Sequence, residues 1–280
     1  MRRLTVALCL AVGLSAVVVG GGIASASQAN TGSSGRSHQG GVLVRTNAHA
    51  ALPRSGGTVS SLNWAGYAVT PASPAITKVT STFTVPSAGL LPVGFAATWT
   101  GIGGYATSDL VQAGVAEQSL PSLPLIGDQY SAWYELLPGA EVQLTGCAGD
   151  SNCTVAPGDS MAIIISQVAT NTWAIAFANS TRHWTWTQAF PYKSSKSSAE
   201  WIVEAPQVES LQTLVAPLST VNMGPVNSYT EGGSTFTIAQ GSPTRIVLTS
   251  GVFSEAVPSA LAANGQSFRV CTYSNSCAAP

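Results

Sequence analysis

Short segments rich in valine, isoleucine, threonine and aromatic residues recur from residue 63 onward, separated by glycine, proline, serine and asparagine. This pattern is typical of β-strands joined by turns, and no long segment with a helical period interrupts it. The chain after residue 60 is long enough for one domain with a sizeable core. We therefore expect an all-β domain over 61–280, built as a two-sheet antiparallel sandwich or jelly roll. The expected strands are 63–69, 81–85, 96–100, 110–115, 130–136, 161–167, 172–177, 183–187, 200–204, 236–239, 245–248 and 267–271.

The first 26 residues have the order of a secretory signal. Arg2 and Arg3 precede an apolar run that ends at the small-residue sequence Ala-Ser-Ala at 24–26. The glycines at 20–22 and this site fit cleavage better than an uncleaved membrane anchor, the other interpretation of about 20 apolar residues. We expect 1–26 to be a signal peptide and the mature protein to be secreted, with no membrane attachment after cleavage.

The segment 27–60 is rich in glycine, serine and alanine and has basic but no acidic residues. Its composition supports no core of its own, so a flexible spacer is one interpretation. The other is a basic propeptide held on an acidic catalytic domain, because five of the 11 basic residues precede residue 60 and all 12 acidic residues follow residue 100. That attraction weakens as carboxylates become protonated in acid.

Charged residues make up only 8% of the chain. With few ion pairs to lose, folding should depend weakly on pH at the acid end, which suits an acidic exterior. The mature chain is acidic and has no basic stripe, so we expect no nucleic-acid partner. We expect a monomer.

Four cysteines follow the signal: Cys147, Cys153, Cys271 and Cys277. Four cysteines allow three connectivities, and pairing within each six-residue spacing is the economical one. We expect these two disulfides to be structural. No Cys-x-x-Cys occurs and one histidine lies after residue 60, so we expect neither a metal nor a cofactor.

The inventory of residues excludes several hydrolase mechanisms. His183 is the only histidine available to a Ser-His-Asp triad, and no Gly-x-Ser-x-Gly elbow is present. The zinc signature His-Glu-x-x-His and the Asp-Thr-Gly or Asp-Ser-Gly signature of pepsin-like enzymes are also absent. We expect His183 to be a strand residue flanked by aromatic side chains.

Polar residues interrupt three of the apolar strands: Gln112, Glu135 and Glu204. Buried carboxamides and carboxylates are costly, so these positions are the first candidates for chemistry. Because side chains alternate along a strand, Glu200 and Glu204 share a face about 13 Å apart, too far for one acid–base pair. Gly114 shares a face with Gln112, and we expect it to leave space for a ligand backbone.

Six sequence blocks in a fixed order resemble the glutamic peptidases, the eqolisin or G1 family, of a bacterial type. They are NWAGY (63–67), STFTVP (81–86), WTGIGG (99–104), LVQAG (110–114), AWYE (132–135) and AEWIVE (199–204). The resemblance covers about 61–204 well and the remainder weakly. It implies a concanavalin A-like jelly-roll sandwich of two curved antiparallel sheets, and an endopeptidase that acts on polypeptides in acid.

The resemblance also implies roles for individual residues. The family's catalytic glutamine falls on Gln112 and its glutamate on Glu204, the second in AEWIVE. Glu135 matches an accessory acidic residue, and Trp99 and Trp133 match aromatic residues that line the cleft. Fungal members carry aspartates where this chain has Gly103 and Ser131, which leaves the pH optimum open.

The two catalytic residue types have separate tasks in peptide hydrolysis. An ionised Glu204 takes a proton from water and later gives it to the departing amine. Gln112 stays neutral at every pH and donates an N–H to the developing oxyanion.

Two other functions are compatible with the same residues. One is a jelly-roll glycoside hydrolase that uses Glu135 and Glu204, with tryptophans as sugar platforms. It lacks the Glu-x-Asp-x-Glu strand motif and leaves Gln112 without a task. The other is a non-catalytic, lectin-like secreted module in which both carboxylates face solvent on edge strands.

Overall fold

The computed structural model describes residues 56–73, 75–89, 92–118, 129–208, 211–250 and 253–280, with the backbone of 36–37 and 43–44. These residues belong to one compact unit, Ser33–Pro280. The predicted signal peptide and most of the predicted leader lie outside the described residues. Within the described part, no helix has the length and apolar character needed to cross a membrane.

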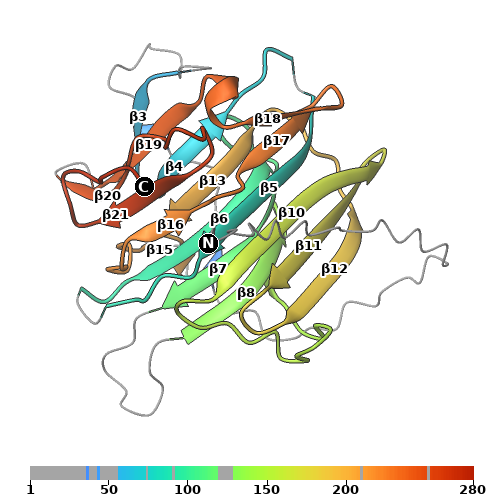
Figure 1. The fold of residues 1–280 in the computed structure, drawn as a ribbon, viewed down its shortest axis with the longest axis horizontal. Helices are drawn as coiled ribbons and strands as arrows, with labels where there is room; N and C mark the ends of the chain where they lie inside the picture. Colours follow the sequence, from blue (N-terminus) through green and yellow to red (C-terminus); the bar gives the residue numbers. More distant parts are fainter. Residues whose placement is uncertain are drawn as a thin grey trace, which may run out of the picture. The chain divides into compact units, whose positions relative to one another are not determined.

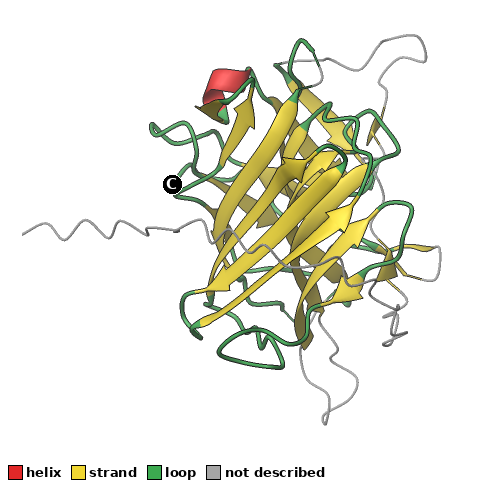
Figure 2. Cartoon of the chain, turned by 90° about the vertical axis from the view of Figure 1, so that its right-hand side faces the viewer, coloured by secondary structure: helices red, strands yellow, loops and turns green. Residues whose placement is uncertain are grey.

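The described chain is almost entirely β-structure, with one short 3-10 helix, Ala239–Gly241 (Figure 2). The strands are β1 (Arg36–Ser37), β2 (Leu43–Val44), β3 (Thr58–Ser61), β4 (Trp64–Val69), β5 (Ile76–Thr84), β6 (Phe95–Gly103), β7 (Leu110–Gln118), β8 (Gln129–Leu136), β9 (Val142–Gln143), β10 (Ser160–Ala169), β11 (Thr172–Asn179), β12 (Trp184–Pro191), β13 (Ala199–Glu204), β14 (Gln207–Val208), β15 (Leu211–Gln212), β16 (Val221–Met223), β17 (Ser228–Glu231), β18 (Ser234–Thr237), β19 (Thr244–Thr249), β20 (Ser254–Pro258) and β21 (Phe268–Thr272).

The long strands form two layers, as Figure 1 shows. In one layer the order of hydrogen-bonded neighbours is β19, β4, β13, β6, β7, β8 and β9. In the other it is β18, β17, β5, β10, β11 and β12. The neighbours in both series run antiparallel, so the predicted all-β sandwich of antiparallel sheets is confirmed.

Because side chains alternate along each strand, the strands of the first layer have two faces with different contacts. One face of β13, β6 and β7 packs against β5, β10 and β11 in the main core. Trp201 belongs to this face and donates its indole N–H to the carbonyl of Thr80 on β5, at 3.0 Å. We call the opposite face of β13, β6, β7 and β8 the site face; it carries a second, smaller apolar cluster that includes Trp64, Trp99 and Trp133.

Most predicted strands are present, but their ends and some short strands differ. His183 is not a strand residue: it lies in the turn before β12 with φ 59°, and β12 begins at Trp184. The segment 236–239 was predicted as a strand, whereas β18 ends at Thr237 and a 3-10 turn follows. Short strands such as β16, β17 and β20 were missed, because three to five residues carry too little alternation to be recognised.

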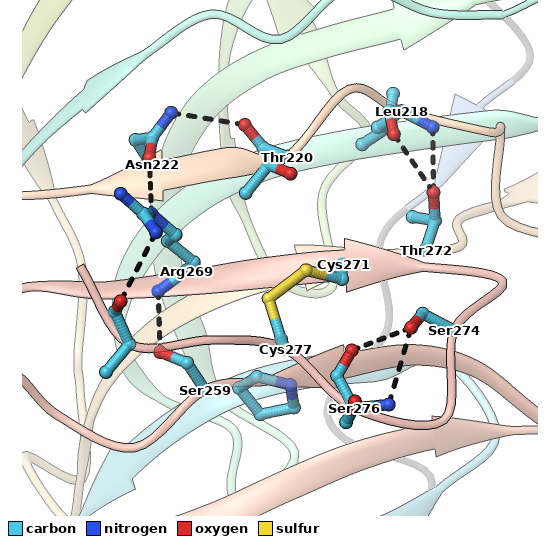
Figure 3. The surroundings of a disulfide bond; sticks show 12 residues. Leu218, Thr220, Asn222, Ser259, Arg269, Cys271, Thr272, Ser274, Ser276 and Cys277 are labelled. Atoms are coloured by element: carbon cyan, nitrogen blue, oxygen red, sulfur yellow. Dashed lines mark hydrogen bonds between the residues drawn. A yellow bond between two sulfur atoms is a disulfide. The ribbon is translucent and has the colours of Figure 1, made fainter.

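Both predicted disulfides are present, Cys147–Cys153 and Cys271–Cys277. The second begins on β21, as Figure 3 shows. The neighbouring Arg269 donates to Oδ1 of Asn222, and the Thr272 hydroxyl accepts the backbone N–H of Leu218 and donates to its carbonyl, which joins β21 to the segment 218–222. Each disulfide joins cysteines six residues apart in sequence, so both close short local loops and neither bridges the two layers.

Candidate active site

Four polar or small residues form one row across four adjacent strands of the site face. Glu200 on β13 lies opposite Gly101 on β6, Gly101 lies opposite Gln112 on β7, and Gln112 lies opposite Glu135 on β8. Neighbouring strands are about 4.8 Å apart, so the Cα atoms of Glu200 and Gln112 are separated by roughly 10 Å. Gly101 has no side chain, and the place that its Cβ atom would take lies 2.9 Å from Cδ1 of Leu110 and 3.0 Å from Cζ3 of Trp99.

The Glu200 side chain has no solvent-exposed surface. Burial raises the pKa of its carboxyl well above the ordinary value, because the charged form loses hydration. The Ser198 hydroxyl opposes this rise in pKa, the negative charge of Asp109 adds to it, and the Tyr105 backbone N–H again opposes it. The site therefore favours the protonated form of Glu200 while it is closed to water.

Gln112 is equally buried, and its Nε2 donates to Oε2 of Glu135 at 2.8 Å. A carboxylate accepts hydrogen bonds and does not donate them, so this contact determines which end of the carboxamide faces Glu135. One amide hydrogen remains for another acceptor. Glu135, predicted as an accessory acidic residue, is thus the group that orients Gln112.

Glu204 belongs to a different row of the same face. Its register partner on β6 is Ala97, four residues from Gly101 along the strand. Oε2 of Glu204 accepts the indole N–H of Trp99 at 2.8 Å, and Oε1 accepts from Nδ2 of Asn63 at 3.4 Å. Glu204 is buried and already engaged with an aromatic side chain.

The Trp99 indole separates Glu204 from Gln112. Its nitrogen contacts Glu204, while Cζ3 on its opposite edge lies 3.0 Å from the place a Cβ atom would occupy at Gly101. The row of Gln112 therefore contains Glu200, whereas Glu204, the predicted partner of Gln112, lies two rows away, beyond the row of Ile202 and Trp99. Sequence alternation could not distinguish the two glutamates, since both point to the same face and only the register with β6 decides.

Trp99 and Trp133, the aromatic residues predicted to line the cleft, lie on the site face, with Gly114 between them in register. Both are fully buried, and Trp64 packs edge-on against Trp99 with ring centroids 5.0 Å apart. The space expected beside Gly114 is filled: a Cβ atom there would lie 2.4 Å from Cβ of Trp99. Gly114 thus admits an aromatic side chain, not a ligand backbone.

The arrangement speaks against the two other functions. Glu135 and Glu204 are three strands apart, roughly 14 Å across the sheet alone, whereas glycosidase carboxylates act at about 5 to 9.5 Å. Both carboxylates are buried on central strands, which contradicts the solvent-facing edge positions of a lectin-like module.

Two further observations concern the described residues outside the row. A cavity of about 670 Å³ lies beside the first half of β8 and the 152–157 loop, and none of the four residues of the row lines it. Across the described ranges, no group of three histidine, cysteine, aspartate or glutamate side chains has a geometry for a metal ion.

Comparison with known proteins identifies the family of the chain. The sequence model of the Peptidase A4 family matches residues 62–271. No curated protein sequence matches the chain at a significant level.

Several solved structures share the fold. Scytalido-glutamic peptidase, solved with a transition state analog inhibitor, has 19% identity and a TM-score of 0.62, over 75% of this chain and 98% of its own. SCP-B, an eqolisin solved with the tripeptide Ala-Ile-His, has 18% identity and a TM-score of 0.57 over the same shares. Aspergilloglutamic peptidase from Aspergillus niger has 23% identity and a TM-score of 0.54, over 64% of this chain and 99% of its own.

The family match covers most of the β-domain, including every residue of the Glu200–Gly101–Gln112–Glu135 row. The chain belongs to the Peptidase A4 family, the glutamic peptidases, and is a glutamic endopeptidase.

Proposed function

We propose that the protein is a secreted endopeptidase that hydrolyses polypeptides in acid with Gln112 and Glu200 as its catalytic pair. The observation that carries the proposal is the shared row of these two residues, with Gly101 between them. A separation of roughly 10 Å between Cα atoms would accommodate a peptide carbonyl and a water molecule once the Leu110 and Trp99 side chains, which fill the place of a Cβ atom at Gly101, move aside.

Glu200 acts as general base and then as general acid. Its carboxylate takes a proton from water as the water attacks the scissile carbonyl carbon, and the resulting carboxylic acid gives that proton to the departing amine. The raised pKa of Glu200 suits the second step, because the carboxyl holds the accepted proton firmly until the amine takes it.

Gln112 stabilises the oxyanion. Its Nε2 uses one hydrogen for Glu135, and the other is available to the carbonyl oxygen as negative charge develops. Loss of one such donor typically costs about 2.7 to 4 kcal/mol, or ~100- to 1000-fold in rate. A carboxamide supplies this donor at any pH, which a carboxylic acid does only while protonated.

We further propose that the leader, 27–60, keeps the site closed before secretion is complete. Two backbone pairings support this role: β1 pairs with β14 directly after β13, and β2 pairs with β3 directly before β4. The leader thus pairs with the segment that follows β13 and with the segment that precedes β4, both toward the end of β13 at which Glu204 lies opposite Trp64. Removal of a cover would hydrate Glu200 and lower its pKa, which would produce the ionised base.

The test of the catalytic pair compares two isosteric variants on one strand. Purified Glu200→Gln should lose about 100- to 10,000-fold in cleavage of a denatured protein at pH 3 to 4, the range for a missing general acid–base. Glu204→Gln keeps an acceptor for the Trp99 indole and should retain most of the activity. An inactive Glu204→Gln beside an active, folded Glu200→Gln would overturn the assignment.

The test of the leader follows the N-terminus by mass spectrometry during the same incubation. Activity should appear as the N-terminus moves past residue 44. Glu200→Gln should keep its leader when alone and lose it when wild-type enzyme is added, if processing is by the enzyme itself. Equal activity of full-length and processed protein would contradict the proposed role.

A further inference from the structure

Asp109 lies in the loop between β6 and β7. Its side chain links this loop by hydrogen bonds to the segment that leads into β13. Its Oδ2 accepts the backbone N–H of Ser195 at 2.6 Å and the hydroxyl of Ser194 at 3.3 Å. The backbone N–H of Gly103, at the end of β6, donates to the carbonyl of Ser198 at 3.0 Å. Ser198 is buried and is followed in the chain by Ala199 and Glu200.

The Asp109 carboxylate occupies the space that a side chain at Gly103 would need. A Cβ atom at Gly103 would lie 2.9 Å from Oδ2 of Asp109 and 2.7 Å from its backbone oxygen, and φ there is +89°. Gly103 is two residues beyond Gly101, the member of the row between Glu200 and Gln112. A carboxylate from the loop therefore fills the position two residues along β6 from Gly101, in the row next to the proposed catalytic row.

A second set of contacts joins the same two segments. The hydroxyl of Tyr192 accepts the backbone N–H of Leu110 at 2.8 Å and donates to the carbonyl of Leu137 at 2.8 Å. Thr107 accepts the backbone N–H of Gly104 at 3.0 Å. The loop is thus held at several points, and Asp109 is the acidic group among them.

We propose that Asp109 is a positioning residue of the active site: it holds the segment leading into Glu200 and keeps a second negative charge beside the Glu200 carboxyl. This inference rests on the proposed role of Glu200. The charge of Asp109 is one cause of the raised pKa of Glu200, after burial. Tyr105 interacts electrostatically with Glu200, and Tyr192 with Asp109 and Glu135; burial is the chief cause of their raised pKa values, and raises that of Tyr192 to about 12. Lys193 and Lys196 flank the two serines that contact Asp109.

The sign of the expected effect follows from this geometry. Removing the negative charge makes ionisation of Glu200 easier, so the carboxylate forms at lower pH. The acid limb of the pH–rate profile, which reports ionisation of the general base, should then move to lower pH. A purely structural role of Asp109 would change stability but leave the position of this limb unchanged.

The experiment measures kcat/KM against pH for processed enzyme carrying Asp109→Asn, Asp109→Ala or Asp150→Asn. Asp109→Asn keeps an oxygen that can accept the Ser195 N–H, so this variant should show the acid limb at lower pH with a similar plateau. Asp109→Ala also loses the contact and should lower kcat by up to about 100-fold, the cost of a misplacement of roughly 1 Å. Asp150→Asn removes the same charge from a turn in which Asp150 accepts the N–H groups of Asn152 and Thr154, and its limb should match the wild type.

Two outcomes would separate the inference from the function on which it rests. If Glu200→Gln is inactive and the profile of Asp109→Asn coincides with that of wild type, the inference about Asp109 is wrong and the proposed function stands. If Glu200→Gln is as active as wild type, the proposed function itself fails. A second readout is the pH dependence of unfolding in the full chain, in which Asp109→Asn should move the Glu200-linked change to lower pH.

Discussion

The hydrogen bond between Gln112 and Glu135 makes a strong prediction for Gln112→Glu. The substitution is nearly isosteric and places a second carboxyl 2.8 Å from Oε2 of Glu135. Two full charges at that distance repel by about 6 kcal/mol at an effective dielectric constant of ~20. The variant pair should therefore share one proton, and the protein should be close to wild-type stability at pH 4 but lose up to about 6 kcal/mol as that proton is removed at higher pH.

The catalytic activity of Gln112→Glu should stay low even at pH 4, where its stability is close to that of wild type. The shared proton lies between the two carboxyls, so position 112 has no donor left for an oxyanion, and the rate should fall ~100- to 1000-fold even at pH 4. The double variant Gln112→Glu with Glu135→Gln reverses the direction of the hydrogen bond. It should recover the stability at neutral pH, because the carboxamide introduced at position 135 donates to the carboxylate introduced at position 112, yet remain inactive.

The assays are urea denaturation at pH 4 and pH 7, and cleavage of a denatured protein by the processed variants. The urea denaturation shows whether the variants are folded, since the double variant should unfold at nearly the same urea concentration as wild type. Recovery of more than about a tenth of wild-type activity in the double variant would refute the reasoning, because a carboxylate at position 112 would then serve nearly as well as the carboxamide, which the donor argument excludes.

Three further predictions concern neighbouring residues. Gly101→Val should destabilise the protein by about 1 to 3 kcal/mol, because its Cβ would lie 2.9 Å from Leu110 Cδ1. It should also lower kcat/KM sharply, because its methyl groups would lie between Glu200 and Gln112. Normal activity of Gly101→Val would show that the reaction does not use the region between these two residues. Trp99→Phe should lower the free energy of unfolding, measured by urea denaturation, by about 1.5 to 3 kcal/mol, because the buried Glu204 carboxylate loses the indole N–H donor. Unchanged stability would show that this hydrogen bond contributes little. Glu200→Gln should flatten the stability–pH curve of the full chain: the folded-state pKa of Glu200 is raised, so its contribution is complete below the unfolded pKa and declines as pH rises toward the folded pKa. A wild-type curve without that decline would contradict the raised pKa.

The sequence predicted the fold well and the row of candidate catalytic residues incompletely. Strands such as β7 and β13 are long enough to show their composition, and alternation placed both glutamates of β13 on one face, where the structure has them. Alternation specifies a face and not a row, however. The row depends on which residue of β6 lies opposite Glu200, and that register results from contacts between segments about 100 residues apart in the chain.

Asp109 was missed for a related reason. Gly103 stands where fungal members of the family carry an aspartate, and its lack of a side chain was visible in the sequence. A carboxylate that fills the same space from a loop six residues later has no periodic signal, because loop side chains follow no fixed alternation. Only the coordinates bring position 109 next to position 103.

The proposed catalytic groups and their supports sit on four central strands, and this has a consequence for how such enzymes diversify. Hairpin connections other than the β6–β7 loop, which carries Asp109, can gain or lose residues without moving Glu200 relative to Gln112, whereas a single deletion inside β6 or β7 would turn every following side chain to the opposite face. Natural variation in length should therefore concentrate in the turns. Directed-evolution libraries for new cleavage preferences should randomise those turns and leave the strand lengths untouched.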